Sequence, residues 1–255
     1  MLMKHVIQSV LKPFGLRLAR LDVTQNPASE RKPAFGLEVF FSLLKRLGFA
    51  PKRIMDVGAN HGNWTRKAIE YFPQAGYTLV EPQDALKLHI QDLIERGYKI
   101  QWIHAAAGDI AGTLPFLISR RDDSSSFVPV QRQSQPNRAR QIMVSVRTLN
   151  EIVSASQMPA PDMIKIDAEG FDLKVLEGAS DLFGQTDVFL VEAVVCCVDY
   201  QNTVLDVVQF MANVGYRLID ITDLNRSPKD NVLWLCELVF LRNASSLLES
   251  ANSYE

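Results

Sequence analysis

Short apolar segments alternate with segments of helical periodicity from residue 53 almost to the end of the chain. Strands that are joined through helices pair in parallel, so this alternation predicts a mostly parallel sheet with helices on both faces. The predicted strands are 54–57, 77–80, 100–107, 113–118, 142–146, 163–166, 188–195, 216–221 and 233–241. The predicted helices are 37–47, 63–72, 84–96, 170–178 and 201–213.

The first 33 residues differ from the rest in charge and in pattern. Residues 1–21 contain four basic residues, no acidic residue and an apolar stripe, and residues 22–33 are polar with two prolines. We therefore expect a basic amphipathic arm and a linker over 1–33, an α/β domain with an N-terminal covering helix over 34–245, and a polar tail over 246–255. The arm suits an anionic membrane surface, a protein partner or a homodimer contact.

Composition excludes several classes of protein. A net charge of −2 is not that of a general nucleic-acid binder, so no nucleic-acid partner is expected. Three cysteines, Cys196, Cys197 and Cys236, are too few for a disulfide framework. The sequence has no apolar run of about 18 residues and no signal-peptide pattern. We expect a cytoplasmic protein, with peripheral contact at the inner face of the membrane through residues 1–21.

A glycine-rich turn, residues 56–62 (DVGANHG), joins the first predicted strand to the next helix. Gly58 and Gly62 allow a tight turn and close approach of a ligand. The third glycine of the dinucleotide fingerprint is absent, and Asp56 precedes the first glycine. A carboxylate at this point suits a ligand with a cationic amino-acid end better than a pyrophosphate.

Two further acidic residues follow the next predicted strands. Glu81 ends the second strand, roughly 20 residues after the glycine turn, where a carboxylate accepts hydrogen bonds from ribose hydroxyls. Asp109 follows the small residues 105–108, which leave room for a flat base, and it is placed to accept from an adenine amino group. A helix-cap carboxylate and an ordinary turn aspartate are the structural alternatives.

Three acidic residues lie at the predicted ends of later strands. Asp167 and Glu169 follow the strand 163–166, and Glu192 lies inside the apolar segment 188–195. Functional residues collect at the carboxyl ends of parallel strands, so the three acids are expected close together. A buried carboxylate needs a partner, and an ion pair with Lys165 is the structural alternative.

These motifs together resemble the FkbM-type methyltransferases over roughly residues 50–195. The segments that carry the resemblance are DVGANHG, VEP, AAAGD and IKIDAEGFDLKVLEGA, with VRTLNEI before the last. The resemblance implies a Rossmann-like class I methyltransferase fold, with a mostly parallel seven-stranded sheet and helices on both faces. Asp172 stands where such proteins often have glutamate, a change that keeps the charge.

The resemblance also implies the cofactor and the reaction. It implies S-adenosylmethionine held by Asp56, Gly58, Asn60, Gly62 and Glu81, with Asp109 on the adenine side. It further implies O-methylation of a sugar, a glycolipid or a polyketide natural product.

An aliphatic hydroxyl needs a general base or a metal ion to react near neutral pH. We expect the base among Asp167, Glu169, Glu192 and His61, and we favour Asp167 and Glu169. Oxygen ligands favour a hard cation, so Asp167, Glu169 and Glu192 are also the predicted ligands of Mg²⁺ or Ca²⁺.

Two other functions are compatible with this architecture. A nucleotide-cofactor oxidoreductase shares it, although the missing third glycine counts against that function. A non-catalytic, membrane-associated binding module keeps the fold without the reaction, although the full set of acids counts against it.

Overall fold

The computed structural model describes residues 35–118, 126–127, 140–196 and 202–248. One compact unit spans Phe35–Glu255. The predicted basic arm and linker over 1–33 lie outside the described residues. Within the described ranges, no helix is long and apolar enough to cross a membrane.

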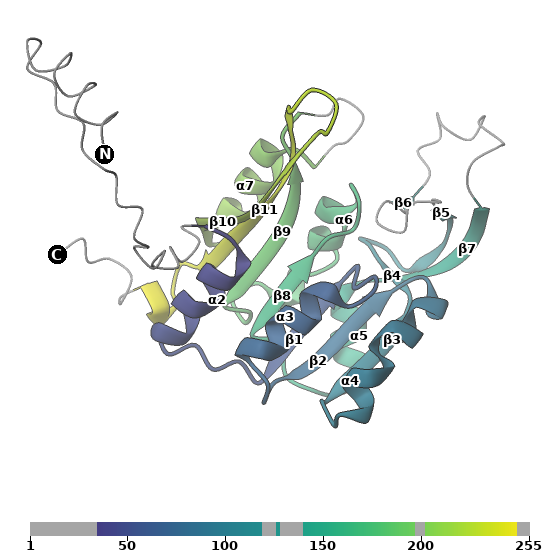
Figure 1. The fold of residues 1–255 in the computed structure, drawn as a ribbon, viewed down its shortest axis with the longest axis horizontal. Helices are drawn as coiled ribbons and strands as arrows, with labels where there is room; N and C mark the ends of the chain where they lie inside the picture. The colour runs from purple at the N-terminus through teal and green to yellow at the C-terminus, as the bar shows by residue number, and fades with distance from the viewer. Residues whose placement is uncertain (1–34, 119–125, 128–139, 197–201, 249–255) are drawn as a thin grey trace, which may run out of the picture. The chain divides into compact units, whose positions relative to one another are not determined.

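The main sheet has seven strands in the order β10-β11-β9-β8-β1-β2-β3, which confirms the predicted mostly parallel sheet (Figure 1). The five strands from β9 to β3 pair in parallel, while β11 pairs antiparallel with both β9 and β10. The strands are β1 (Arg53–Val57), β2 (Gly76–Glu81), β3 (Ile100–His104), β8 (Met163–Ile166), β9 (Val188–Val194), β10 (Tyr216–Arg226) and β11 (Leu233–Arg242).

Helices cover both faces of this sheet, as the sequence predicts. On one face, α2 (Leu37–Arg46), α3 (Asn63–Tyr71) and α4 (Gln91–Glu95) bury their apolar sides in a core that includes Phe41, Leu79 and Leu190. On the other face, α5 (Leu149–Ser156), α6 (Asp172–Glu177) and α7 (Val204–Asn213) pack on a second core. Short 3₁₀ helices form at η2 (Asp84–Ile90), η4 (Ser180–Leu182) and η5 (Ser246–Leu248).

Helix α5 is absent from the sequence prediction, although a local signal for it exists. The Thr148 hydroxyl accepts from the Glu151 backbone N–H, and the Glu151 carboxylate accepts from the Thr148 backbone N–H. These two hydrogen bonds form a capping box, and the T-x-x-E spacing in the sequence indicates one. The predicted single helix over 84–96 is also divided, because its first half is the 3₁₀ helix η2.

The single strand predicted over 100–107 is divided between β3 in the main sheet and a second, four-stranded sheet, which also contains the strands predicted at 113–118 and 142–146. Its order is β4-β7-β5-β6, with β4 (Ala106–Ala107), β5 (Gly112–Ile118), β6 (Ser126–Phe127) and β7 (Arg140–Arg147). The chain turns at Ala105, whose N–H donates to the Ile103 carbonyl at 2.9 Å, and it leaves the main sheet there. Gly108 allows this path, because a Cβ atom there would lie 2.9 Å from Cγ1 of Val146.

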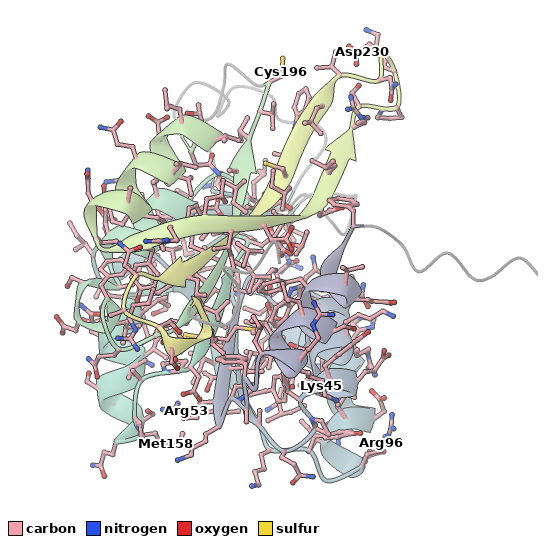
Figure 2. The ribbon with its side chains drawn as sticks, turned by 90° about the vertical axis from the view of Figure 1, so that its left-hand side faces the viewer. Lys45, Arg53, Arg96, Met158, Cys196 and Asp230 are labelled. Atoms are coloured by element: carbon pink, nitrogen blue, oxygen red, sulfur yellow. The ribbon has the colours of Figure 1, made fainter. Side chains whose placement is uncertain are left out.

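The β10–β11 hairpin is longer than predicted and bends along its length. Its pairing shifts register between Leu218 and Asp220, between Ile221 and Asp223, and between Asn225 and Arg226. Such irregularities bend a strand and re-aim its side chains. Figure 2 shows Asp230, between β10 and β11, and Cys196, just past β9, at the end of the molecule opposite Arg53, the first residue of β1.

Candidate active site

A cavity of about 480 Å³ runs along the carboxyl ends of the parallel strands. Its walls come from the segments after β1, β2 and β8, from β4 and β5, from α2 and α3, and from the β10–β11 hairpin. Ligands bind at this edge of open α/β sheets. Among the predicted site residues, Gly58, Asn60, His61, Glu81, Asp167 and Glu169 line the cavity.

The glycine turn forms the floor of the cavity between β1 and α3. Gly58 has a φ of 74°, and its N–H donates to the Val80 carbonyl at 2.9 Å. Gly62 has a φ of 73°, and a Cβ atom there would lie 2.4 Å from Cγ2 of Ile90. Both positions therefore require glycine for conformation and for space. Asn60, between them, also adopts a left-handed conformation, with a φ of 48°.

Glu81 presents a fixed carboxylate to the cavity from the end of β2. Its side chain is buried, and its two oxygens accept the backbone N–H groups of Asn60 and Gln83, each at 3.0 Å. Burial raises the pKa of Glu81, and these hydrogen bonds oppose that rise. Oε1 also accepts from Nε2 of Gln83 at 3.4 Å, whereas Oε2 keeps a further lone pair. Glu81 can therefore accept one ligand hydroxyl at Oε2 and a second at Oε1 in place of the long contact with Gln83.

Asp56 lies beneath the glycine turn and does not line the cavity. Its side chain is fully buried, Oδ2 accepts the Thr65 hydroxyl at 2.5 Å, and Oδ1 lies 3.5 Å from Nζ of Lys165. The predicted direct contact with a ligand is therefore replaced by an ion pair within the protein. Asp56 anchors α3 through its hydrogen bond with Thr65 and orients Lys165 through the ion pair.

Lys165, which the sequence presents only as an ion-pair partner, lines the cavity itself. Its Nζ atom lies 3.1 Å from Oδ2 of Asp167 and 3.5 Å from the Gly58 carbonyl oxygen. Burial alone lowers the pKa of Lys165, but the carboxylates of Asp167 and Asp56 outweigh it and raise the pKa above its usual value. The ammonium group is therefore charged and shared between two carboxylates.

Asp172 holds the turn that carries Asp167 and Glu169. Its carboxylate accepts the backbone N–H groups of Ala168 at 2.8 Å and Gly170 at 3.1 Å, and the Nδ2 group of Asn202 at 2.7 Å. Burial raises the pKa of Asp172 to about 7. The same turn places Glu169 at a φ of 51°, a strained conformation for a residue other than glycine. Asp167 and Glu169 are thus positioned by the acidic residue in α6.

Glu192 does not line the cavity, contrary to its predicted role as a base. Burial, followed by the charges of Asp167, Asp172 and Glu169, raises the pKa of Glu192 to about 10. A carboxyl group with this pKa keeps its proton at neutral pH and accepts no other.

The predicted metal site is not formed by these residues. No group of three or more His, Cys, Asp or Glu side chains in the described ranges could hold a metal ion, so Asp167, Glu169 and Glu192 do not form the expected ligand set. The physical reason lies with Lys165 and Glu192. The Lys165 ammonium already neutralises Asp167, and Glu192 is protonated.

Asp109 and His61 complete the predicted set. Asp109 does not line the cavity, and its carboxylate lies 3.1 Å from Nζ of Lys174. His61 lines the cavity, and its ring meets that of His89 edge to face with centroids 4.3 Å apart. Gly62 shapes the turn without lining the cavity.

The hairpin contributes cavity residues that the sequence analysis missed, namely Thr222, Asp223 and Glu237. The Thr222 hydroxyl donates to Oε1 of Glu237, and burial raises the pKa of Glu237 to about 7. A glutamate inside the apolar segment 233–241 is the same signal that singled out Glu192. Trp64 from α3 and Phe116 from β5 add aromatic walls.

Comparison with known proteins gives a family match. The model of the family described as "Methyltransferase FkbM domain" matches residues 56–218. The methyltransferase FkbM from Methylobacillus flagellatus KT has a similar structure, with 17% identity and a TM-score of 0.50. The match covers 73% of this chain and 43% of that one, so this chain spans less than half of that protein. That likeness concerns the fold.

Two further solved structures are more distant. The precorrin-6y C5,15-methyltransferase from Geobacter metallireducens GS-15 is 13% identical, with a TM-score of 0.43 and coverage of 80% of this chain and 88% of that one. The Burkholderia thailandensis 1,6-didemethyltoxoflavin-N1-methyltransferase, solved with S-adenosylhomocysteine, is 12% identical, with a TM-score of 0.43 and coverage of 79% and 75%. A search of curated proteins finds no match.

Proposed function

Because the chain belongs to the FkbM family of S-adenosylmethionine-dependent methyltransferases, we propose that it methylates a hydroxyl group of a sugar or another polyhydroxylated compound. One observation carries this proposal. A single cavity joins the fixed carboxylate of Glu81 on β2, at one end, to the acidic residues Asp223 and Glu237 of the β10–β11 hairpin, at the other. The first end suits a nucleoside, and the second suits an acceptor rich in hydroxyl groups.

The residues at the Glu81 end fit S-adenosylmethionine. Glu81 offers carboxylate oxygens to the ribose hydroxyls. The small side chains of Ala106 and Ala107 and the ring of Phe116 offer an apolar wall to a flat base. The Lys165–Asp167 ion pair offers both charges to a zwitterionic amino-acid end. When bound, the cofactor supplies a methyl group on a cationic sulfur.

The charges along the cavity support a neutral acceptor. Among the described residues that line it, five have carboxyl groups (Glu81, Asp167, Glu169, Asp223 and Glu237) and one, Lys165, has an ammonium group. This excess of negative charge would repel phosphate or carboxylate groups on an acceptor. Hydroxyl groups instead donate hydrogen bonds to carboxylates, and charge-assisted bonds of this kind are strong. A neutral sugar, free or on a glycolipid, has the matching chemistry.

The chain's own residues would align the reactants and accept a proton. Alignment of two reactants supplies roughly 7–11 kcal/mol of a barrier when the site is rigid. The glycine turn and the segment after β8 are rigid in this sense, because their backbone N–H groups donate hydrogen bonds to the carboxylates of Glu81 and Asp172. Asp167 and Glu169 remain candidates to hold the acceptor hydroxyl, and His61 lies on the same cavity wall.

The partners and the location of the chain are also part of the proposal. We propose that residues 1–21 carry the enzyme to an anionic membrane surface at the cytoplasmic face, where a glycolipid acceptor would be reached. Four basic residues without an acidic residue support this, because such segments bind anionic headgroups.

A transfer assay tests the function. Full-length protein and S-adenosylmethionine with a tritiated methyl group are incubated with methyl glycosides of a neutral hexose, a deoxyhexose, an amino sugar and a uronic acid. We expect labelled product with the neutral sugars and none with the uronic acid. Calorimetry with NAD serves as the comparison, and tight NAD binding without binding of S-adenosylmethionine would support an oxidoreductase. Cofactor binding without methyl transfer to any hydroxyl compound would overturn the proposal in favour of a binding module.

A further inference from the structure

We infer that Glu237 is the proton acceptor for the hydroxyl group that is methylated. This inference rests on the proposed function and adds a catalytic residue to it. Glu237 lies in β11, inside the segment LWLCELVFLR, and lines the cavity.

The position of Glu237 in the sheet places it away from the cofactor end of the cavity. The strand order β11-β9-β8-β1-β2 puts four strand spacings between Glu237 and Glu81. Neighbouring strands lie about 4.8 Å apart, so the backbones of β11 and β2 are separated by roughly 19 Å across the sheet. A ligand held at Glu81 and at the glycine turn of β1 leaves the β11 end of the cavity for the acceptor.

The hydrogen bonds of Glu237 leave it able to accept a proton. Oε1 accepts the Thr222 hydroxyl, and within the described residues no hydrogen bond reaches Oε2. Two of the other cavity carboxylates are more engaged. Glu81 is bound by two backbone N–H groups, and Asp167 forms its ion pair with Lys165 at 3.1 Å. Glu237 is therefore freer than Glu81 and Asp167 to bind an acceptor hydroxyl.

The groups that face Glu237 come from its two neighbouring strands, β9 and β10, and from β8 beyond β9. Glu192 is its register partner in β9, so the two side chains leave the sheet on the same face. Lys165 and Asp167 act on it from the β8 side, and Asp223 acts on it from β10. Because Glu192 is protonated, it adds no charge beside Glu237. Burial raises the pKa of Glu237 to about 7, where a carboxylate is both available and basic enough to act as a general base.

The transfer step balances with this assignment. The acceptor oxygen forms a bond to the methyl carbon as the bond between that carbon and sulfur breaks. The electron pair of the broken bond stays on sulfur, which becomes a neutral thioether. The hydroxyl proton passes to Oε2 of Glu237, which then releases it to solvent.

The test uses the full-length variants Glu237→Gln and Glu237→Asp, with Glu192→Gln as a matched buried control. Calorimetry with S-adenosylmethionine and circular dichroism first establish that each variant binds the cofactor and folds. Infrared spectra recorded at about pH 6 and about pH 8 then report carboxyl protonation, and the pH profile of methyl transfer to the best neutral methyl glycoside reports the base.

We expect Glu237→Gln to bind S-adenosylmethionine like the wild type and to lose turnover by about 10²- to 10⁴-fold. Glu237→Asp should restore part of the activity and keep the rise of the rate with pH, and Glu192→Gln should keep that rise as well. In the infrared spectra, the loss of protonated-carboxyl signal between the two pH values should be smaller in Glu237→Gln. Asp172 titrates in the same range, so the difference from the wild type is the quantity that counts.

Two results would overturn the assignment. One is a Glu237→Gln variant with wild-type turnover and the wild-type pH profile. The other is an unchanged infrared difference in that variant, which would mean that Glu237 does not exchange a proton near neutral pH. Failure of the proposed function has a different appearance, because the wild type would then methylate no sugar while the infrared titration of Glu237 remained.

Discussion

A Cβ atom on Gly58 would stand 1.9 Å from the backbone carbonyl oxygen of Asp167. The glycine turn after β1 and the acidic turn after β8 are therefore in direct backbone contact, although more than a hundred residues separate them in the sequence. The Asp167 N–H also donates to the Val57 carbonyl at 3.1 Å. The two motifs form one rigid unit at the floor of the cavity.

Gly58→Ala should destabilise the protein strongly. The new methyl group meets backbone rather than a flexible side chain, and the φ of 74° is strained for alanine. We expect a loss of about 3 kcal/mol or more in the free energy of unfolding. Gly48→Ala is the control, because Gly48 has a φ of 84° with no atom within 4 Å, so only strain applies. Thermal unfolding of both variants measures the difference, and equal losses would show that the contact with Asp167 is not as tight as described.

Glu81→Ala should weaken the binding of S-adenosylmethionine. Hydrogen bonds to a charged group contribute about 1.5–3 kcal/mol each, so we expect affinity to fall by about 10- to 100-fold or more. Calorimetry measures this, with Glu95→Ala as a control at the exposed end of α4. Unchanged cofactor affinity in Glu81→Ala would remove Glu81 from the binding site.

Glu192→Gln should become more stable relative to the wild type as pH rises. Glu192 has a pKa of about 10 in the folded chain and 4.5 as its ordinary value, so the folded state holds this proton more tightly. The stability contributed by this group is therefore complete below pH 4.5 and falls as pH rises toward 10. Glutamine cannot ionise and avoids that loss. Urea unfolding at about pH 6 and about pH 8 compares the two proteins, and a difference that does not grow with pH would contradict the protonated state of Glu192.

Removal of residues 1–21 should reduce binding to anionic vesicles. The full-length chain should sediment with vesicles that contain phosphatidylserine at low salt and should be released by added salt, since the attraction is electrostatic. The shortened protein should stay in the supernatant, and neutral phosphatidylcholine vesicles serve as the control. Equal sedimentation of both proteins would favour a protein partner or a dimer contact for this arm.

The sequence by itself determined the elements and their order. Apolar periodicity is local, so it identified the seven strands of the main sheet and the helices that cover it, apart from α5. It also identified the glycine turn and Glu81, because a tight turn after a strand accepts only a few residue types, and such a local pattern is visible in the sequence. The expected family followed from the same motifs, and the family match confirms it.

Only the tertiary structure decided which acidic residues face the cavity and which carry charge. Asp56, Asp167 and Glu192 look alike in the sequence, as carboxylates at or near strand ends. In the fold, Asp56 is fully buried and pairs with Lys165, and Asp167 pairs with the same lysine at the cavity wall. Glu192 does not line the cavity and keeps its proton, because burial raises its pKa. Glu237 reaches the same cavity from the far end of the chain because β11 is inserted beside β9. Burial and charge pairing depend on contacts between strands that are distant in sequence, and a local pattern carries no information about those contacts.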